Sequence, residues 1–241
     1  MKVSNKAKER FCKDCNLPIK LFQEPYFSDR LKLYDPFYGT VKKWNRFISE
    51  LQKYNCEQDY FEEYNRVKDA AITYIKDSEA YQRFNIEDMT EFSVTHKDLP
   101  SNDIFKSTND GKVFISIDMR KANFSSLQFY DRSIFGNVST WEEFLSQFTD
   151  NRHIIDSKYI RQVILGNCNP KRHITYEKWI MDQVFTTLEQ KYGYGFSKRI
   201  VFFSNDEIVY DVTDLEIGRA YELRDVLYHD LKEHFSVPFR V

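Results

Sequence analysis

Acidic residues stand at two places where β-strands are expected to end. Asp118 directly follows the apolar run VFISI, and Asp206, with Glu207 beside it, lies between two runs of β-branched and aromatic residues. If these runs pair in one sheet, the carboxylates converge, which is costly unless a cation lies between them. We therefore predict Asp118, Asp206 and Glu207 as ligands of Mg²⁺ or Mn²⁺, with Asp118 and Asp206 catalytic in two-metal phosphoryl transfer. The alternative is ordinary turn chemistry at each Asp.

Basic residues near two of the expected element boundaries are candidates for binding a substrate phosphate. Lys171 and Arg172 follow an Asn-Pro pair that is typical of a helix start. Cations in a first turn oppose the helix dipole, so a bound anion explains them better than helix stability does. Arg120 and Lys121 come just after the first aspartate and could face a triphosphate. For all four residues, the alternative is a solvated surface charge.

The apolar spacing of the second part predicts the elements that would position these groups. Residues 112–118 alternate as a strand does, and 199–212 has the pattern of a hairpin turning at Ser-Asn-Asp. The remaining predicted elements are helices over 140–149, 156–165 and 173–192, a helix capped by Thr213 or Asp214, and a final strand over 237–241. This order predicts an α+β fold with a ferredoxin-like (split βαβ) sheet, in which the first strand and the hairpin are central neighbours.

The first part of the chain, residues 1–100, is expected to be mostly helical. Apolar residues recur at helical spacing within 40–54 and 57–76, and we interpret these stripes as core positions. A polar stretch with a Pro and an Asn-Asp-Gly turn signal lies at 95–112. We place the domain boundary there, so that the sheet-bearing domain spans 112–241.

Three motifs of the second part resemble those of the polymerase palm superfamily. FISIDMRKANFSSL (114–127) resembles motif A, a strand that ends in a catalytic Asp, and IVFFSNDEIVYDV (200–212) resembles motif C, the hairpin with the second carboxylate. GNCNPKRHITYEKWIMDQVF (166–185) stands where motif B lies in reverse-transcriptase-like and family-B-like palms. The resemblance covers about 112–241 and implies a palm packed with a helical, fingers-like region at 1–100.

The resemblance also implies roles for particular residues. The two aspartates would ligate the metals, Lys171 and Arg172 would hold the incoming triphosphate, and Asn123 or Phe124 would lie near the sugar. The implied activity is a metal-dependent nucleotidyltransferase that extends a nucleic-acid 3′ end or makes short products. Its partners would be nucleotides and nucleic acid.

The motifs also depart from the polymerase pattern. Motif C contains Ser-Asn-Asp-Glu where polymerases carry paired acids, and only 35 residues follow Asp206, too few for a thumb. A larger assembly would then supply the thumb. The alternative function is a non-catalytic nucleic-acid- or protein-binding module on a degenerate palm.

Composition narrows the remaining choices. The 241 residues include 35 basic and 37 acidic side chains, which excludes a basic coat over the whole protein, and 17% aromatic residues, which excludes general disorder. Cys12 and Cys15 form half of a zinc-binding pattern without a second pair, so we expect reduced thiols rather than zinc and a cytoplasmic location. No apolar run is long enough for a membrane span, and we expect no membrane partner.

Overall fold

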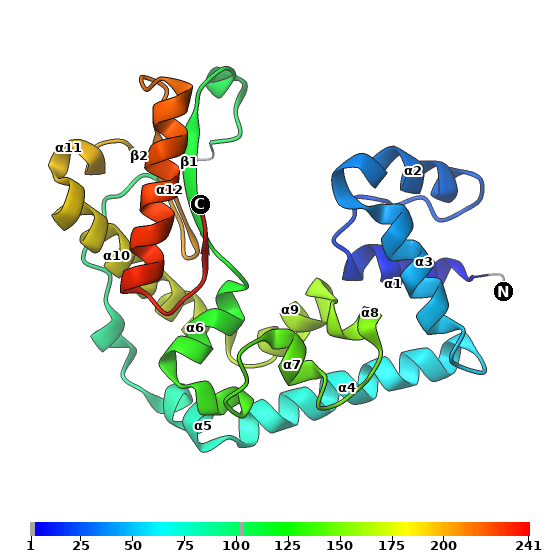
Figure 1. Ribbon diagram of the computed structural model, residues 1–241. Helices are drawn as coiled ribbons and strands as arrows, with labels where there is room; N and C mark the ends of the chain where they lie inside the picture. Colours follow the sequence, from blue (N-terminus) through cyan, green and yellow to red (C-terminus); the bar gives the residue numbers. More distant parts are fainter. Residues whose placement is uncertain (1–2, 102–103) are drawn as a thin grey trace. The chain divides into compact units, whose positions relative to one another are not determined.

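The computed structural model describes residues 3–101 and 104–241 and shows an α+β protein whose chain forms two compact units (Figure 1). The first unit combines Met1–Ser78 with Phe135–Cys168, and the second combines Glu79–Ile134 with Asn169–Val241. The sequence placed one boundary at 95–112, whereas the chain passes between the units three times. The reason is that 135–168 packs with the N-terminal helices. No helix in the described part of the chain is long and apolar enough to cross a membrane.

The first unit is helical. Its elements are α1 (Asn5–Asp14), α2 (Tyr26–Tyr38), α3 (Thr40–Leu51), α4 (Glu57–Asp77), α7 (Trp141–Leu145), α8 (Arg152–Ile155) and α9 (Lys158–Gly166). The predicted helices over 40–54 and 57–76 are confirmed as α3 and α4. The apolar stripe of α4 is at most 3% exposed, as a core stripe should be; it comprises Tyr60, Tyr64, Val67, Ala71 and Ile75. Helix α9 packs against both α1 and α4.

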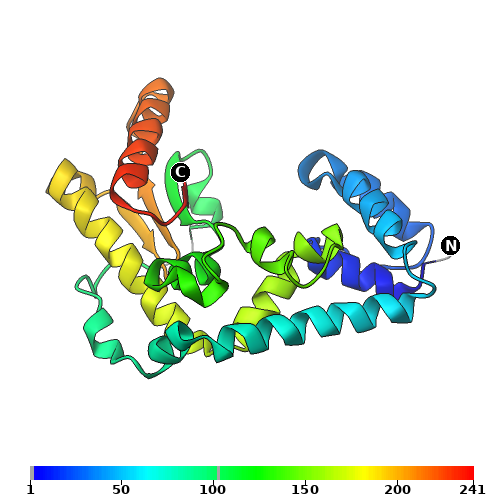
Figure 2. The ribbon, with the colours of Figure 1, turned by 60° about the horizontal axis from the view of Figure 1, so that its bottom comes forward.

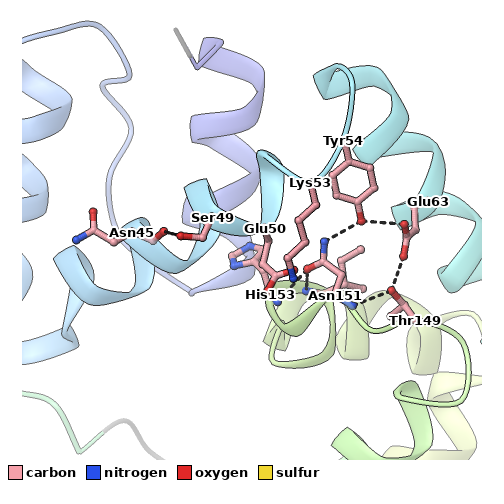
Figure 3. A network of polar contacts seen from close by, with 10 residues as sticks. Asn45, Ser49, Glu50, Lys53, Tyr54, Glu63, Thr149, Asn151 and His153 are labelled. Atoms are coloured by element: carbon pink, nitrogen blue, oxygen red, sulfur yellow. Dashed lines mark hydrogen bonds and ion pairs between the residues drawn. The ribbon is translucent and has the colours of Figure 1, made fainter.

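A polar network joins α4 to the segment that begins α8 (Figure 3). Glu63 on α4 accepts hydrogen bonds from the Tyr54 hydroxyl, at 2.8 Å, and from the Thr149 hydroxyl. The Tyr54 oxygen in turn accepts a 2.9 Å bond from the Asn151 amide. Asn151 is also the N-cap of α8, since its side chain accepts bonds from the backbone N–H groups of His153 and Ile154. The network therefore fixes where α8 begins.

The second unit contains the sheet. Its helices are α5 (Glu79–Ile86), α6 (Ala122–Tyr130), α10 (Pro170–Tyr192), α11 (Tyr194–Ser197) and α12 (Ile217–His234), with short 3₁₀ turns that include η1 (Met89–Phe92). Its strands are β1 (Phe114–Met119), β2 (Ile200–Phe203), β3 (Glu207–Asp211) and β4 (Phe239–Arg240). The strand order is β2-β3-β1-β4, and every pair of neighbours is antiparallel. The predicted first strand, hairpin and final strand are confirmed.

The two faces of β1 differ in burial. Ile115, Ile117 and Met119 are buried, whereas the alternate positions Phe114, Ser116 and Asp118 are partly exposed. Helix α10 packs against β3 and α6, and α12 packs against β4 (Figure 2). The alternation expected from the sequence therefore separates a buried face of β1 from a partly exposed one that includes Ser116 and Asp118.

The start of α12 differs from the prediction. The helix begins after Glu216, which makes no side-chain cap bond. Asp214 pairs instead with the Arg199 guanidinium, and the Thr213 hydroxyl accepts the Val113 N–H at 3.0 Å. The predicted cap at Thr213 or Asp214 is wrong because both side chains are used to secure the end of the hairpin.

Replacing Tyr54 with Phe tests the network of the first unit. Loss of the hydroxyl leaves Glu63 and Asn151 each short of a partner, so we expect Tyr54→Phe to lower the free energy of unfolding by about 1–2 kcal/mol. Urea denaturation followed by circular dichroism measures this change. The control is Tyr26→Phe, because Tyr26 is 60% exposed. Equal stability of the two variants would contradict a structural role for the network.

Candidate active site

Two of the predicted carboxylates lie opposite each other where β1 ends and β3 begins. The register pairs Asp118 with Glu207, and directly opposed residues of an antiparallel pair project from the same face. The Ser116 hydroxyl, from the same face of β1, lies 2.5 Å from Oε1 of Glu207 and donates to it. The partly exposed face of β1 therefore carries an acidic pair at one end.

Asp206 lies in the hairpin turn next to this pair. Its backbone carbonyl accepts a 2.8 Å hydrogen bond from the N–H of Met119, which continues the β1–β3 ladder by one residue. Its carboxylate is 3.1 Å from the Ser204 hydroxyl, which donates to Oδ1. The structure thus brings Asp118, Asp206 and Glu207 to one end of the sheet.

A basic residue of the last strand lies beside the pair. Arg240 is opposite Asp118 in the β1–β4 register, and its guanidinium is 3.1 Å from Oδ2 of Asp118. The Arg240 side chain is 69% exposed and the Asp118 side chain 29%. The charge of Asp118 is therefore balanced within the chain by a side chain that is free to move into solvent.

A fourth acidic residue, which the sequence analysis missed, lies under the hairpin turn. Glu177 of α10 is only 4% exposed, and Nδ2 of Asn205 donates a 2.8 Å hydrogen bond to its Oε2. Burial raises the pKa of Glu177 to about 7; the Asn205 hydrogen bond lowers it, and the nearby charge of Asp206 raises it. One signal in the sequence could have identified Glu177. It is a charged residue four positions before Met181, among the apolar residues of the helix predicted over 173–192.

The basic residues after β1 lie where that strand turns into α6. Arg120 is exposed, and its backbone N–H donates to the Pro238 carbonyl at 2.9 Å. Lys121 has a positive φ of 52° and immediately precedes α6. Asn123 is half-buried, but Phe124 is only 3% exposed and belongs to the core of the second unit. Of the two residues predicted near a sugar, Asn123 is thus the accessible one.

Lys171 and Arg172 have different surroundings at the start of α10. Lys171 is exposed. Nε of Arg172 donates to the Phe84 carbonyl at 3.0 Å, and a terminal nitrogen donates to the Glu87 carbonyl. The last carbonyls of a helix lack intrahelical partners, so Arg172 satisfies the end of α5. This contact gives the cation a structural reason to lie in a first turn, and Lys171 remains the one directed to solvent.

The carboxylates at the end of β1 are of the kind that binds Mg²⁺ in proteins. Within 3–101 and 104–241, no group of three or more His, Cys, Asp or Glu side chains is arranged to hold a metal. Mg²⁺, however, is commonly bound by one or two carboxylates, with water and substrate phosphates completing its octahedron. Asp118 and Glu207 on one face supply such a pair. The four cysteines are free thiols, and two of them, Cys12 and Cys168, are buried.

Comparison with known proteins gives no relative for this chain. We found no match among protein-family models, curated proteins or solved structures. The assignment of a function to the site therefore rests on its own geometry and chemistry.

The titration of Glu177 tests the arrangement under the hairpin. Burial is the largest cause of the raised pKa and the charge of Asp206 adds to it, so we expect Asp206→Asn to lower the pKa of Glu177 below about 7 while burial keeps it above the ordinary value of 4.5. Carbon-detected NMR titration of the Glu177 carboxyl measures the shift. The control is Asp225→Asn on the exposed side of α12, which should leave the pKa unchanged. A Glu177 pKa that does not respond to Asp206→Asn would place the two groups apart.

The same group predicts how stability depends on pH. The folded-state pKa is raised, so the native state holds the proton more tightly than the unfolded chain does. The stabilisation is complete below pH 4.5 and is lost as pH rises through about 7. We expect Glu177→Gln to remove this dependence, which amounts to about 3 kcal/mol at most. Urea denaturation of both proteins between pH 4.5 and 8 measures it, and parallel curves would contradict the prediction.

Proposed function

We propose that this protein is a metal-dependent nucleotidyltransferase that acts on nucleotides and a nucleic-acid 3′ end or makes short products. Asp118 and Asp206 are its catalytic residues and, with Glu207, its metal ligands. The observation that carries the proposal is the β1–β3 register, which sets Asp118 opposite Glu207. The Met119–Asp206 backbone bond adds the third carboxylate at the same strand end.

The sheet topology supports a palm-type arrangement. Antiparallel neighbours in the order β2-β3-β1-β4, with helices between β1 and β2 and again between β3 and β4, match a split βαβ sheet. In that arrangement β1 and β3, the second strand of the hairpin, are central, in keeping with the palm resemblance of 114–127 and 200–212. We include the ferredoxin-like palm in the proposal on this basis.

The chain's own groups have distinct tasks in the proposed reaction. A bound Mg²⁺ or Mn²⁺ would supply Lewis acidity to the attacking hydroxyl and charge neutralisation to the leaving pyrophosphate. Arg240 balances Asp118 before substrate binds and moves to the substrate phosphates afterwards. Arg120 and Lys121, on the turn after β1, add positive charge for the phosphates. Glu177, half protonated near neutral pH, holds Asn205 and so orients the hairpin turn.

A hollow beside the acidic pair has the chemistry of a nucleotide site. Its volume is about 330 Å³, and its lining includes Tyr221, Arg224 and Arg240. Ser116, which donates to Glu207, lines it as well. The Arg224 guanidinium lies 5.0 Å from the centre of the Tyr221 ring. We propose that the aromatic side chains receive the base and the two arginines receive the phosphates.

The Asp118–Arg240 ion pair favours a second candidate function. A carboxylate that already has a cationic partner needs no metal, as in a palm that is kept for binding alone. In this alternative the sheet end is a non-catalytic module for nucleic acid or protein. The two functions differ in whether a divalent cation is required.

Nucleotide incorporation tests the proposed activity. We expect the protein to incorporate radiolabelled NTPs or dNTPs in Mn²⁺ or Mg²⁺, with or without a primed template. Asp118→Asn and Asp206→Asn should each reduce the rate about 100-fold or more, because each removes a carboxylate that holds the metal. Asp29→Asn, at an exposed position of α2, is the control and should retain the rate. If a missing thumb limits product length, short products should still appear.

Metal binding distinguishes the two functions. Mn²⁺ bound to the protein is measured by electron paramagnetic resonance, and it should be lost in Asp118→Asn and strengthened in Arg240→Gln. If no nucleotide is incorporated, no Mn²⁺ binds and nucleic acid is retained in chelator, the enzyme proposal is wrong and the binding module is supported.

A further inference from the structure

A second polar pocket lies entirely within the first unit, at the start of α9. Its volume is about 260 Å³, and we call it the α9 pocket. It is lined by Asp14, Cys15, Lys43, Arg46, His153, Asp156, Ser157 and Lys158. The end of α1, the helix α3 and the turn between α8 and α9 meet here. None of these residues belongs to the proposed active site.

The α9 pocket has more positive charge than its own carboxylates balance. Arg46 is paired with Asp156. Lys43 and Lys158 have no side-chain hydrogen bond or ion pair with any residue that the structure describes. The lining holds three cations, Lys43, Arg46 and Lys158, against two carboxylates, Asp14 and Asp156, an excess of one positive charge. The imbalance therefore points to a negatively charged ligand.

The backbone at the mouth of the α9 pocket also favours an anion. Ser157 is the N-cap of α9, a helix of nine residues with no acidic side chain in its first turn. The first N–H groups of a helix lack intrahelical acceptors, and the helix dipole is positive at this end. Lys158 in that turn opposes the dipole, so helix stability does not explain its position. A phosphate between the N–H groups and the lysine does.

The base of the α9 pocket is already built and satisfied. The Asp14 side chain is fully buried and accepts hydrogen bonds from Tyr64 at 3.0 Å, from Ser157 at 2.8 Å and from Nε2 of His153 at 3.1 Å. The Asp14 carboxylate lines the pocket, and three side-chain donors already occupy its oxygens. Those bonds also fix the positions of Ser157 and His153. Hydrogen bonds to a buried carboxylate therefore hold two residues of the pocket lining in place.

Cys15 adds no charge to the α9 pocket. The pKa of the Cys15 thiol is raised to about 12, mainly by burial, with the charge of Asp14 adding to the effect and Lys43 and Arg46 opposing it. The thiol therefore stays neutral and does not compete with an anion for the cations. It also lacks the thiolate character that a nucleophilic role would need.

We propose that the α9 pocket binds a terminal phosphate group, the phosphomonoester end of a nucleotide or of a nucleic-acid strand. The buried side chains Asp14 and His153 lie at one end of the lining, so the cavity suits a group that enters end-on rather than a backbone that passes through. A phosphomonoester carries close to two negative charges at neutral pH, and the two lysines of the pocket are available to pair with its oxygens. Lys43, Lys158 and the first-turn N–H groups of α9 bind its oxygens, and Arg46 exchanges Asp156 for the ligand.

Calorimetric titration of the full chain tests the proposal with three probes. The probes are inorganic phosphate, a 5′-phosphorylated single-stranded DNA decamer and the same decamer with a 5′-hydroxyl. We expect the phosphorylated decamer to bind most tightly. Lys43→Gln with Lys158→Gln should weaken its binding by about tenfold or more, since two charge-assisted contacts are lost. The matched control, Lys32→Gln with Lys42→Gln, removes two exposed lysines outside the pocket and should change binding little.

Each contrary result overturns a definite part of the proposal. No binding of any probe, or an equal loss in the control pair, means that the pocket is not a phosphate site. Equal affinity for the two decamers means that no terminal phosphate is recognised. Circular dichroism of each variant shows that it is folded. The two decamers share the same 3′ end and differ only in the 5′-phosphate, so failure of the nucleotidyltransferase proposal leaves this test intact.

Discussion

The antiparallel pairing of β1 with β3 is the contact on which the candidate site depends. Side chains alternate along a strand, so the register that sets Ile117 opposite Ile208 necessarily sets Asp118 opposite Glu207. A slip of one residue would turn the carboxylates to the buried face and the isoleucines to the polar one. Burial of the isoleucines, both fully enclosed, therefore keeps the acidic pair in place. One strand register therefore fixes both the core contact between the isoleucines and the position of the acidic pair.

Two buried acidic residues show how environment decides what a carboxyl group can do. Asp14 accepts hydrogen bonds from three side chains, which occupy the oxygens of its buried carboxylate. Glu177 has a single donor, Asn205, and lies near another negative charge. Its pKa therefore rises to about 7, where it exchanges a proton near neutral pH. The first group holds a structure together, and the second is poised to titrate.

A basic residue in the first turn of a helix can be structural or available to a ligand, and this protein has an example of each. Arg172 in the first turn of α10 is committed to the carbonyls that end α5. Lys158 in the first turn of α9 has no such partner and lines a cavity with Lys43. The dipole argument applies equally to both turns. The difference is whether another helix ends nearby with carbonyls that need a donor. Where it does, the cation is structural; where it does not, the cation is available to a ligand.

The sequence by itself determined the elements and their faces. Apolar spacing was enough for α3, α4, α10, the hairpin and the polar alternation that exposes Asp118, because local periodicity reports which side of an element is buried. It also identified the candidate carboxylates, because an acidic residue directly after an apolar run can be recognised from the sequence. Tertiary structure alone decided the rest. The return of 135–168 to the first unit, the Asp118–Arg240 pair, the position of Glu177 under the hairpin and the α9 pocket all join residues far apart in the chain. Such contacts depend on which surfaces pack together, and spacing along a sequence carries no record of that choice.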